Sequence, residues 1–409
     1  MISPSSDLPK HSVAIVGSGV AGAAAAIRLA ELGVPVELYE AVAEPQPIGA
    51  GLLLQPTGQQ VLQAMGLLDG ALALGHCLGR LFGDTPTGRT VLDMSYQRLD
   101  PDYFGLGIQR GALMGLLWQR LQQLGVPWHR GAAVDGFEQD AAGVTLRFAK
   151  PRPAPARHAA LILANGSFSR LRSQMKIRQH ARTFPWGAVW TVLPVPEGFA
   201  LNELRQRFRA ARQMLGLMPV GRPHPQGARG INLFWSLPLT ELAHWRDTPG
   251  LDGLKRQMAE LFPAAAPVID GLHDASQLRE ARYADVWMER WHDGRVLAIG
   301  DCAHGMSPQL GQGANLALID AHVLAQQATA GGDWPAVFAR YSHHRSAHLR
   351  FYSQASRGLT PMFQSHATVA PWLRDQFFGW GGRLPFIQKQ SIATLAGTKT
   401  GWLFGRLKL

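Results

Sequence analysis

A short segment near the N-terminus has residue types and a spacing that suit phosphate binding. The segment Gly17-Ser18-Gly19-Val20-Ala21-Gly22 is a GxGxxG pattern. Gly17 permits a tight turn, Gly19 allows a pyrophosphate to approach the backbone, and Gly22 allows a helix to pack closely on a strand. Glu40 lies 18 residues after Gly22, where a carboxylate can accept hydrogen bonds from both hydroxyls of an adenosine ribose. A chance Gly-rich turn is the alternative, but the combination predicts a dinucleotide site.

A second segment combines an apolar strand with a polar loop. The strand beginning at Arg295 ends in Gly300-Asp301, and a loop containing Pro308, Gly311 and Gly313 leads into an expected helix over 314–327. The Asp carboxylate can hold a polyol hydroxyl. The loop backbone and the helix start can face a flat, electron-accepting ring and stabilise negative charge on it. The alternative is an ordinary strand, loop and helix in which the Asp caps the helix.

These motifs need a parallel, doubly wound sheet to position them. Residues 12–17 are predicted to form a buried strand, residues 19–33 an Ala-rich helix and residues 36–40 a second strand. A further helix is expected over 111–125, and further strands are expected near 126–129, 134–139, 144–149 and 160–163. The Pro-rich residues 150–157 indicate a turn or linker. Residues 295–300 return to the same sheet.

A second sheet and a helical C-terminal part follow from the remaining patterns. Aromatic and β-branched residues over 184–195 and 230–237 predict strands of an open sheet, which a hairpin with a DTPTG turn within 78–94 could join. A long helix is expected over 334–359, with a helical tail beyond it. Phe184, Trp186, Trp190, Phe234 and Trp235 could line a hydrophobic pocket or pack a core.

The order of these motifs resembles the single-component, or group A, FAD-dependent aromatic monooxygenases, the para-hydroxybenzoate-hydroxylase-like family. The resemblance covers about residues 12–352 and adds Arg110 in Ile-Gln-Arg-Gly-Ala-Leu and Asn165 in Leu-Ala-Asn-Gly to the two motifs above. It implies an FAD cofactor, with NADH or NADPH as co-substrate. It further implies that O2 adds to the reduced flavin and that the resulting hydroperoxide transfers one oxygen atom to an apolar, aromatic small molecule.

The resemblance also implies an α/β fold with three parts. A discontinuous, doubly wound FAD-binding domain would comprise residues 1–77, 100–180 and 280–335. A mixed β-sheet substrate-binding domain would be inserted as residues 78–99 and 181–279, and a helical segment would cover 336–409.

The same resemblance implies roles for individual residues. Glu40 would bind the adenosine ribose, Asp301 the ribityl chain, Val134 the adenine, and Arg110 the pyrophosphate or ribityl side. The other expected cofactor-binding residues are Gly17, Gly19 and Gly22 at the pyrophosphate, Gly49, Ala50, Gly51 and Leu52 along the flavin, Asn165 and Gly300 in the middle and third motifs, and Pro308, Gly311, Gly313, Ala314 and Asn315 at the isoalloxazine ring.

One departure from the family pattern concerns the coenzyme. The middle motif of the family usually reads Asp-Gly, and that Asp is tied to nicotinamide-nucleotide use, whereas this chain has Asn165-Gly166. An Asn keeps the hydrogen-bonding shape and loses the charge. The departure therefore weakens the NAD(P)H expectation and leaves the FAD expectation intact.

No residue is assigned a catalytic role from the sequence. No Ser-His-Asp, HExxH, Walker A or paired-carboxylate constellation stands out, and a metal shared by His344 and His348 lacks a nearby acid, so no metal is expected. Cys302 is interpreted as a small buried hydrophobic residue. The alternatives to a monooxygenase are a flavin reductase, oxidase or halogenase on the same fold, and a flavin-binding protein without turnover.

Charge is concentrated in the C-terminal part. The chain has a net charge of +11, and residues 334–409 contain ten basic side chains and one acid, Asp375. A solvated basic helical face is one interpretation. Weak peripheral contact with an anionic membrane is another, because Phe377, Phe378, Trp380, Trp402, Leu403 and Phe404 are interleaved with the charges. Alternatively, these apolar side chains pack the tail onto the FAD-binding domain.

Other partners and the cellular location follow from what the sequence lacks. No nucleic-acid-binding motif is visible, so no nucleic-acid partner is expected, and no pattern indicates an oligomeric state. Two cysteines, Cys77 and Cys302, give no disulfide framework, and the N-terminus shows no secretory pattern. These features favour a cytoplasmic protein.

Overall fold

The computed structural model describes residues 12–46, 49–150, 156–382 and 384–407. Its first layer is a six-stranded sheet in the order β18-β19-β12-β1-β2-β8, parallel except for β18. The strands are β1 (Val13–Val16), β2 (Val36–Glu40), β8 (Trp128–Arg130), β12 (Ala160–Leu163), β18 (His292–Asp293) and β19 (Val296–Ala298). β1, β12 and β19 are buried along their whole length, as continuous apolar runs in a parallel sheet require.

Helices cover this sheet and complete the doubly wound arrangement. Helix α1 (Val20–Ala30) packs against α4 (Arg110–Gln123) and α9 (Gly313–Thr329), and α9 in turn packs against α2 (Pro56–Ala64). The Ala-rich face of α1 is buried, which allows this close packing. Two shorter helices are α3 (Leu68–Leu74), which packs against α2 and α4, and α8 (Asp301–His304), which follows β19. The strands and helices expected around both motifs are confirmed.

A seven-stranded sheet forms the second layer, in the order β17-β13-β16-β15-β14-β5-β6. It is mixed, because β14 and β5 are parallel and the other neighbours are antiparallel. Its strands are β5 (Arg80–Asp84), β6 (Thr90–Ser95), β13 (Gln179–Pro194), β14 (Glu203–Arg209), β15 (Gln213–Pro219), β16 (Gly230–Pro238) and β17 (Arg279–Met288). The hairpin expected within 78–94 is confirmed as part of this sheet. β17 crosses the expected domain boundary at residue 280.

Smaller elements complete these layers. Two three-stranded sheets are formed by β3 (Gly51–Leu54), β7 (Gly105–Gln109) and β4 (His76–Leu78), and by β11 (Ala156–His158), β10 (Val144–Phe148) and β9 (Val134–Gln139). Helices α5 (Leu239–Leu242), α6 (Gly250–Leu261) and α7 (Ala266–Asp270) share a core with the second sheet. Short 3-10 helices lie at Tyr96–Arg98, Arg172–Gln174, Pro263–Ala265, Ala275–Gln277 and Pro308–Leu310. Of the expected linker over 150–157, residues 151–155 lie outside the described residues.

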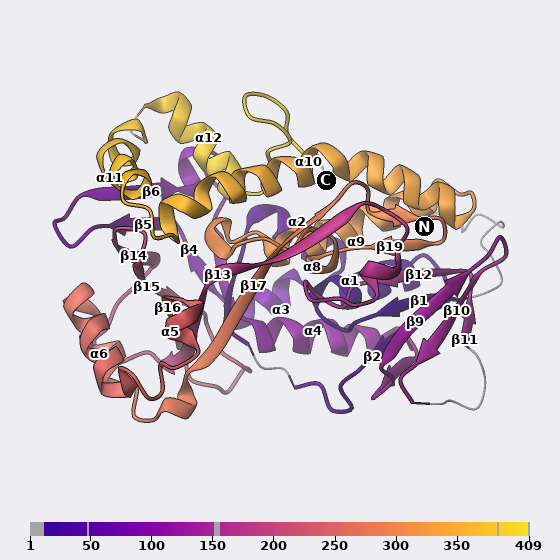
Figure 1. The fold of residues 1–409 in the computed structure, drawn as a ribbon, viewed down its shortest axis with the longest axis horizontal. Helices are drawn as coiled ribbons and strands as arrows, with labels where there is room; N and C mark the ends of the chain where they lie inside the picture. Colours follow the sequence, from indigo (N-terminus) through magenta and orange to yellow (C-terminus); the bar gives the residue numbers. More distant parts are fainter. Residues whose placement is uncertain (1–11, 47–48, 151–155, 383, 408–409) are drawn as a thin grey trace.

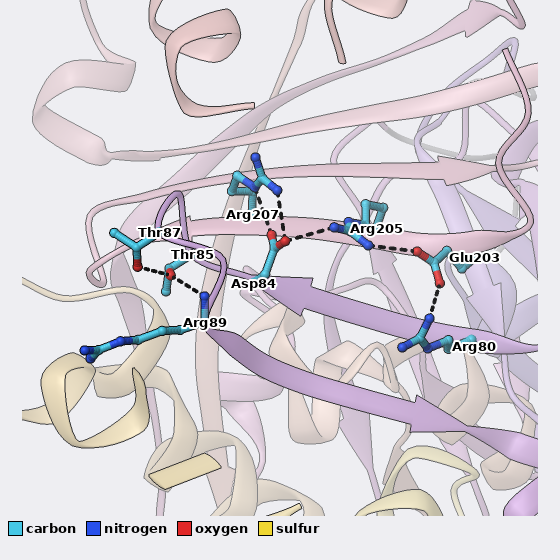
Figure 2. Close-up of polar contacts among 8 residues, drawn as sticks. All are labelled: Arg80, Asp84, Thr85, Thr87, Arg89, Glu203, Arg205 and Arg207. Atoms are coloured by element: carbon cyan, nitrogen blue, oxygen red, sulfur yellow. Dashed lines mark hydrogen bonds and ion pairs between the residues drawn. The ribbon is translucent and has the colours of Figure 1, made fainter. Parts of the chain in front are cut away.

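A row of charged residues joins β5 to β14 at the edge of the second sheet. Figure 2 shows Asp84 accepting hydrogen bonds from Arg205 and Arg207, at 2.8–2.9 Å. Glu203 continues the row by pairing with Arg205 and Arg80. These ion pairs explain how β14, which carries three arginines, forms part of a sheet.

Three helices follow the second motif. They are α10 (Trp334–Phe363), α11 (Val369–Gly381) and α12 (Pro385–Leu395). Figure 1 shows α10 along one edge of the molecule, with α11 and α12 beside its C-terminal end and β6. α10 runs past the expected end at residue 359 and contains Pro361. Phe363, at the end of the helix, packs edge-to-face on Phe208, with 5.2 Å between ring centroids, and this contact stabilises the last turn. No helix in the described part of the chain is long and apolar enough to cross a membrane.

Candidate functional site

A cavity of about 1830 Å³ lies where the two sheets and the C-terminal helices meet. One end is lined by the residues that follow β1, β2 and β12 and by the loop from Met306 to Ala314. The other end is lined by side chains of β5, β6, β14, β15 and β16 and by α10, α11 and α12. The first end lies at the carboxyl ends of parallel strands, where doubly wound folds bind ligands.

Most of the residues expected to bind the cofactor line the first end. Fourteen of the eighteen do so: Gly17, Gly19, Glu40, Ala50, Gly51, Leu52, Arg110, Val134, Asn165, Asp301, Pro308, Gly311, Gly313 and Ala314. The other four, Gly22, Gly49, Gly300 and Asn315, lie outside the lining. Their contacts show that each shapes the backbone or supports a neighbour that does line the cavity.

Each of the three positions of the first motif requires or favours glycine for a different structural reason. Gly17 has a φ of +103°, and a Cβ there would lie 2.5 Å from the Ala164 carbonyl oxygen. A Cβ on Gly22 would lie 1.9 Å from the Gly17 carbonyl oxygen, so only glycine lets α1 pack on this turn. A Cβ on Gly19 would meet nothing within 4 Å. Gly19 therefore leaves open space at the N-terminus of α1, where backbone N–H groups favour an anion.

Glu40 is fixed by the turn that precedes α1. Its Oε2 accepts hydrogen bonds from the Ser18 backbone N–H and the Ser18 hydroxyl, at 2.9 and 2.8 Å, and its Oε1 accepts one from the Val42 N–H at 3.0 Å. Carboxylate oxygens have further lone pairs for ligand hydroxyls. The carboxylate thus lies half-buried at the end of β2, held in place beside the Gly-rich turn.

Arg110 and Asn315 organise the segment over 49–55. The Arg110 backbone N–H donates to the Ala50 carbonyl at 3.1 Å, and a Cβ on Gly49 would overlap the Arg110 side chain. Asn315 is buried; its Oδ1 accepts from the Gln55 N–H at 2.8 Å, and its Nδ2 donates to the Leu53 and Gly311 carbonyls at 3.1 Å. Asn315 joins the β3 segment to the loop that ends at Gly311, and in this structure its amide is used within the protein.

A buried charge network lies behind the Gly-Asp turn. Asp320 on α9 accepts hydrogen bonds from the Gly300 N–H (2.8 Å) and from Arg345 Nε (2.8 Å), and its Oδ2 lies 2.6 Å from His304 Nε2. Burial alone would raise the pKa of Asp320, but the His304 and Arg345 charges and the Gly300 N–H outweigh it and lower the pKa. The network holds Gly300 at its φ of +58° and so positions Asp301. His304 belongs to this network and does not line the cavity.

His348 extends the network to the C-terminal part. Its Nδ1 accepts from Arg345 at 2.7 Å, and its Nε2 donates to the Gly397 carbonyl at 2.8 Å. Burial, aided by the Arg345 charge, lowers the pKa of His348 to about 3. His343 and His344 are exposed on the same helix. His348 therefore acts as a neutral hydrogen-bonding bridge between α10 and residue 397.

Two polar atoms in the cavity wall fit a polar ligand at the first end. Asn165 Oδ1 and Gln309 Nε2 are buried, and neither has a hydrogen-bond partner among the described residues. Both residues line the cavity. Buried polar groups are normally satisfied, so an acceptor and a donor without partners indicate groups that a ligand would satisfy. Together with the open space at Gly19, these atoms fit a dinucleotide such as FAD.

The second end is apolar and was only partly predicted. Trp190 and Phe234 line it as expected, whereas Trp186 and Trp235 are buried in the protein and Phe184 lies outside the lining. Apolar side chains in this wall that were not predicted include Val91, Leu92, Met94, Leu204, Met214, Met218, Leu359, Met362, Phe363 and Phe378. The cavity-lining residues Met214, Gly216 and Met218 alternate along β15, and this period of two and the apolar spacing of α10 were the available signals.

Tyr283 is the polar aromatic residue of this wall. It lies on β17 and lines the cavity, and burial raises the pKa of its hydroxyl. Trp287 stacks on His180 outside the cavity lining, and Trp291 is buried in the core. Cys302 is buried, and burial raises the pKa of its thiol to about 11, which confirms the interpretation of a buried, unreactive residue.

Comparison with known proteins identifies the family of this chain. Residues 10–354 match the FAD binding domain family. The FAD-dependent urate hydroxylase of Klebsiella pneumoniae is 28% identical over 344 residues, which is 82% of this chain and 86% of that protein. The kynurenine 3-monooxygenase of Xanthomonas campestris is 29% identical over 357 residues, which is 82% of this chain and 75% of that protein.

Solved structures share the fold. Klebsiella pneumoniae HpxO complexed with FAD and uric acid has a TM-score of 0.78 at 24% identity, covering 94% of this chain and 97% of that chain. The 2-methyl-3-hydroxypyridine-5-carboxylic acid oxygenase has a TM-score of 0.73 at 22% identity, covering 91% and 98%. At these identities the likeness concerns the fold.

The fold and the first end of the cavity thus define an FAD-dependent flavoprotein. The chain belongs to the FAD binding domain family, within the group A, para-hydroxybenzoate-hydroxylase-like monooxygenases. It is therefore an FAD-dependent monooxygenase, an oxidoreductase, and the resemblance found in its sequence is confirmed.

Proposed function

We propose that this enzyme hydroxylates an apolar aromatic small molecule, consuming NADH or NADPH and O2. The supporting observation is that one cavity joins the Gly-rich turn, Glu40 and Asp301 to the apolar face of the seven-stranded sheet. FAD bound at the first end would supply the redox chemistry and the activation of O2. The protein's own contribution is to bind the cofactor, orient the substrate and keep water away from the reacting atoms.

At the cofactor end the proposed roles follow from the positions of the side chains. The N-terminus of α1 and Gly19 would accept the pyrophosphate, Glu40 the adenosine ribose and Asp301 the ribityl chain. The flavin ring would lie between two segments that line the cavity, 50–52 and 308–314. Asn165 Oδ1 would accept a hydrogen bond from FAD or the nicotinamide coenzyme, and this bond would give the buried oxygen the partner that it lacks within the protein.

At the substrate end the wall favours an apolar ring system. Phe234, Trp190 and the methionines Met214 and Met218 would contact its faces, as aromatic and thioether groups do. Tyr283 has a raised pKa and so keeps its proton at neutral pH. Its hydroxyl would therefore donate a hydrogen bond to a polar substituent of the substrate and would not act as a base.

Coenzyme oxidation with a substrate panel tests the proposal. Purified protein is expected to be yellow and to release FAD, and an aromatic compound is expected to accelerate NADH or NADPH oxidation. Asn165→Asp should change the coenzyme KM more than the FAD content, since the site keeps its shape and gains a charge. Protein that cannot be reconstituted with FAD, or that reduces its flavin with neither coenzyme across a broad panel, would count against the proposal.

The domain boundaries, the membrane contact and the cellular location are also parts of this proposal. We assign residues 1–77, 100–180 and 280–335 to the FAD-binding domain, 78–99 and 181–279 to the substrate domain and 336–409 to the helical segment. The enzyme is proposed to work in the cytoplasm and to make weak contact with an anionic membrane through that helical segment. The membrane contact is supported by the positions of the exposed side chains.

A further inference from the structure

Exposed apolar side chains are concentrated at one place in the described chain. In the described residues, thirteen large hydrophobic side chains are exposed, and eleven of these lie between residues 369 and 404. We call them the C-terminal apolar face: Val369, Trp372, Leu373, Phe377, Trp380, Leu384, Phe386, Ile387, Trp402, Leu403 and Phe404. Of the residues that could pack the tail onto the FAD-binding domain, Trp402 contacts Phe351 of α10 edge-to-face, with 5.2 Å between ring centroids. Phe377, Trp380, Leu403 and Phe404 are exposed. Exposed apolar patches of this kind mark interaction sites.

The orientation of α11 is fixed by its inner side. Arg374 is fully buried and donates to the Met362 and Ala210 carbonyls, at 2.8 and 2.9 Å, and to Asp375 at 2.6 Å. Its guanidinium also lies 5.0 Å from the ring centroids of Phe208 and Phe363. The outer side of α11 carries Trp372, Phe377 and Trp380. Arg374 thus holds the inner side of α11, whereas the exposed apolar side chains on the outer side suit a second apolar environment.

The cavity opens within this face. Five residues are both exposed and part of the cavity lining: Phe377, Trp380, Phe386, Ile387 and Trp402. Apolar side chains therefore form an exposed part of the cavity lining, beside the substrate end. An apolar molecule could pass from an adjoining apolar phase into the cavity without crossing water.

The exposed charges around the face are positive. Lys389 on α12 and Arg406 beyond it are exposed, and the single acid of residues 334–409, Asp375, is paired with Arg374. Figure 2 shows Arg89, in the β5–β6 turn, extending toward the neighbouring C-terminal helix. In contrast, Arg345 and Arg357 pair with Asp320 and Asp285 within the protein. Lys389 and Arg406 are thus exposed basic residues close in sequence to members of the apolar face, and Arg350 is exposed on α10.

We propose that the C-terminal apolar face docks on an anionic phospholipid bilayer, and that a lipid-soluble aromatic substrate enters the cavity directly from that bilayer. The substrate part rests on the proposed hydroxylase function, and the docking assigns residues to the membrane contact proposed above without depending on the hydroxylation. Tryptophans flanked by lysine and arginine suit the interface of an anionic membrane. A second copy of the chain seated on this face would cover the five residues shared with the cavity and block entry there. A bilayer could instead supply an apolar substrate at the same place, which favours lipid as the occupant.

Sedimentation with liposomes of pure phosphatidylcholine, or of phosphatidylcholine with phosphatidylserine, tests the docking. The FAD-loaded full chain should bind the anionic liposomes at low salt and bind less at high salt. Trp372→Ser with Phe404→Ser should lower the apparent binding constant by about tenfold, and Lys389→Glu with Arg406→Glu by a similar factor. Neither pair lies in the cavity lining.

Two matched controls separate this face from general effects. Phe168→Ser removes an exposed apolar residue outside the face, and Lys150→Glu with Arg256→Glu reverses two exposed charges elsewhere; both should leave liposome binding unchanged. Equal, negligible binding of the unmodified chain to both liposome types at low salt would overturn the proposal. A lipid-free dimer that Trp372→Ser with Phe404→Ser converts to monomer, without liposome binding, would also overturn it in favour of a second copy.

FAD content and coenzyme oxidation are measured on the same preparations. Loss of these activities in protein that still binds anionic liposomes would contradict the proposed function and leave the docking intact. Retained activity without liposome binding would contradict the docking alone.

Discussion

The two ends of the cavity are built by different means. At the cofactor end, backbone geometry and fixed polar groups form the wall: Gly17 and Gly22 set the turn, and Glu40 is held by three hydrogen bonds. At the substrate end, side chains such as Met214, Phe234 and Met362 form the wall. Backbone geometry tolerates few residue types, whereas apolar side chains of similar volume can replace one another. Substitutions should therefore have larger and more specific effects at the cofactor end.

The largest effect is expected at Asp320. Asp320→Asn leaves Arg345 buried with a neutral partner, and breaking such a pair costs about 3–5 kcal/mol. The same change at Asp84 should cost less, about 1–2 kcal/mol, because water can reach its partners Arg205 and Arg207. Urea unfolding of the FAD-free proteins measures both. Equal losses would show that burial does not distinguish the two networks.

Acid should destabilise the protein through His348. This imidazole stays neutral in the folded protein because its pKa is lowered to about 3, while the unfolded chain binds a proton near pH 6.5. Stability is therefore lost as the pH falls from about 6.5 toward 3, by up to about 1.4 kcal/mol per pH unit from this group. His348→Gln should flatten this slope, and His343→Gln, on the exposed side of α10, should not. Free energies of unfolding of the two variants, measured across this pH range, test this prediction.

A methyl group at Gly19 should weaken FAD binding selectively. The added Cβ meets no protein atom within 4 Å, so Gly19→Ala should leave the unfolding free energy of the FAD-free protein nearly unchanged. It fills the space through which a pyrophosphate would approach, and FAD affinity should fall by about tenfold or more. Gly115→Ala, also in open space, is the control. Unchanged FAD affinity in Gly19→Ala would contradict the placement of the pyrophosphate.

The smallest effect is expected at the substrate end. Phe234→Leu keeps an apolar side chain in the wall, so the KM for the substrate should rise by about tenfold or less, and FAD content should stay unchanged. Phe82→Leu, on the same sheet but outside the cavity lining, should leave both values unchanged. Loss of FAD from Phe234→Leu would show that the two ends are not independent.

This difference also explains what the sequence could predict. The turn at Gly17, the acid at Glu40 and the Gly300-Asp301 turn were predictable, because close backbone approach restricts residue type and spacing. Asn315 was expected at the ring, but its amide joins β3 to the neighbouring loop, which only the tertiary structure reveals. Strand β14 was missed because its arginines look solvent-exposed in sequence, whereas Arg205 and Arg207 pair with Asp84. The exposure of Trp380 depends on how Arg374 anchors α11, which no local pattern encodes.

Isotope labelling tests most directly the claim that one cavity brings FAD and an apolar aromatic substrate together for oxygen insertion. The FAD-loaded enzyme is supplied with NADH or NADPH, ¹⁸O2 and the aromatic compound that accelerates coenzyme oxidation, and the product is weighed by mass spectrometry. The account predicts one ¹⁸O atom in each product molecule, with coenzyme and product in equal amounts. An unlabelled product, with hydrogen peroxide accounting for all the O2 consumed, would contradict it.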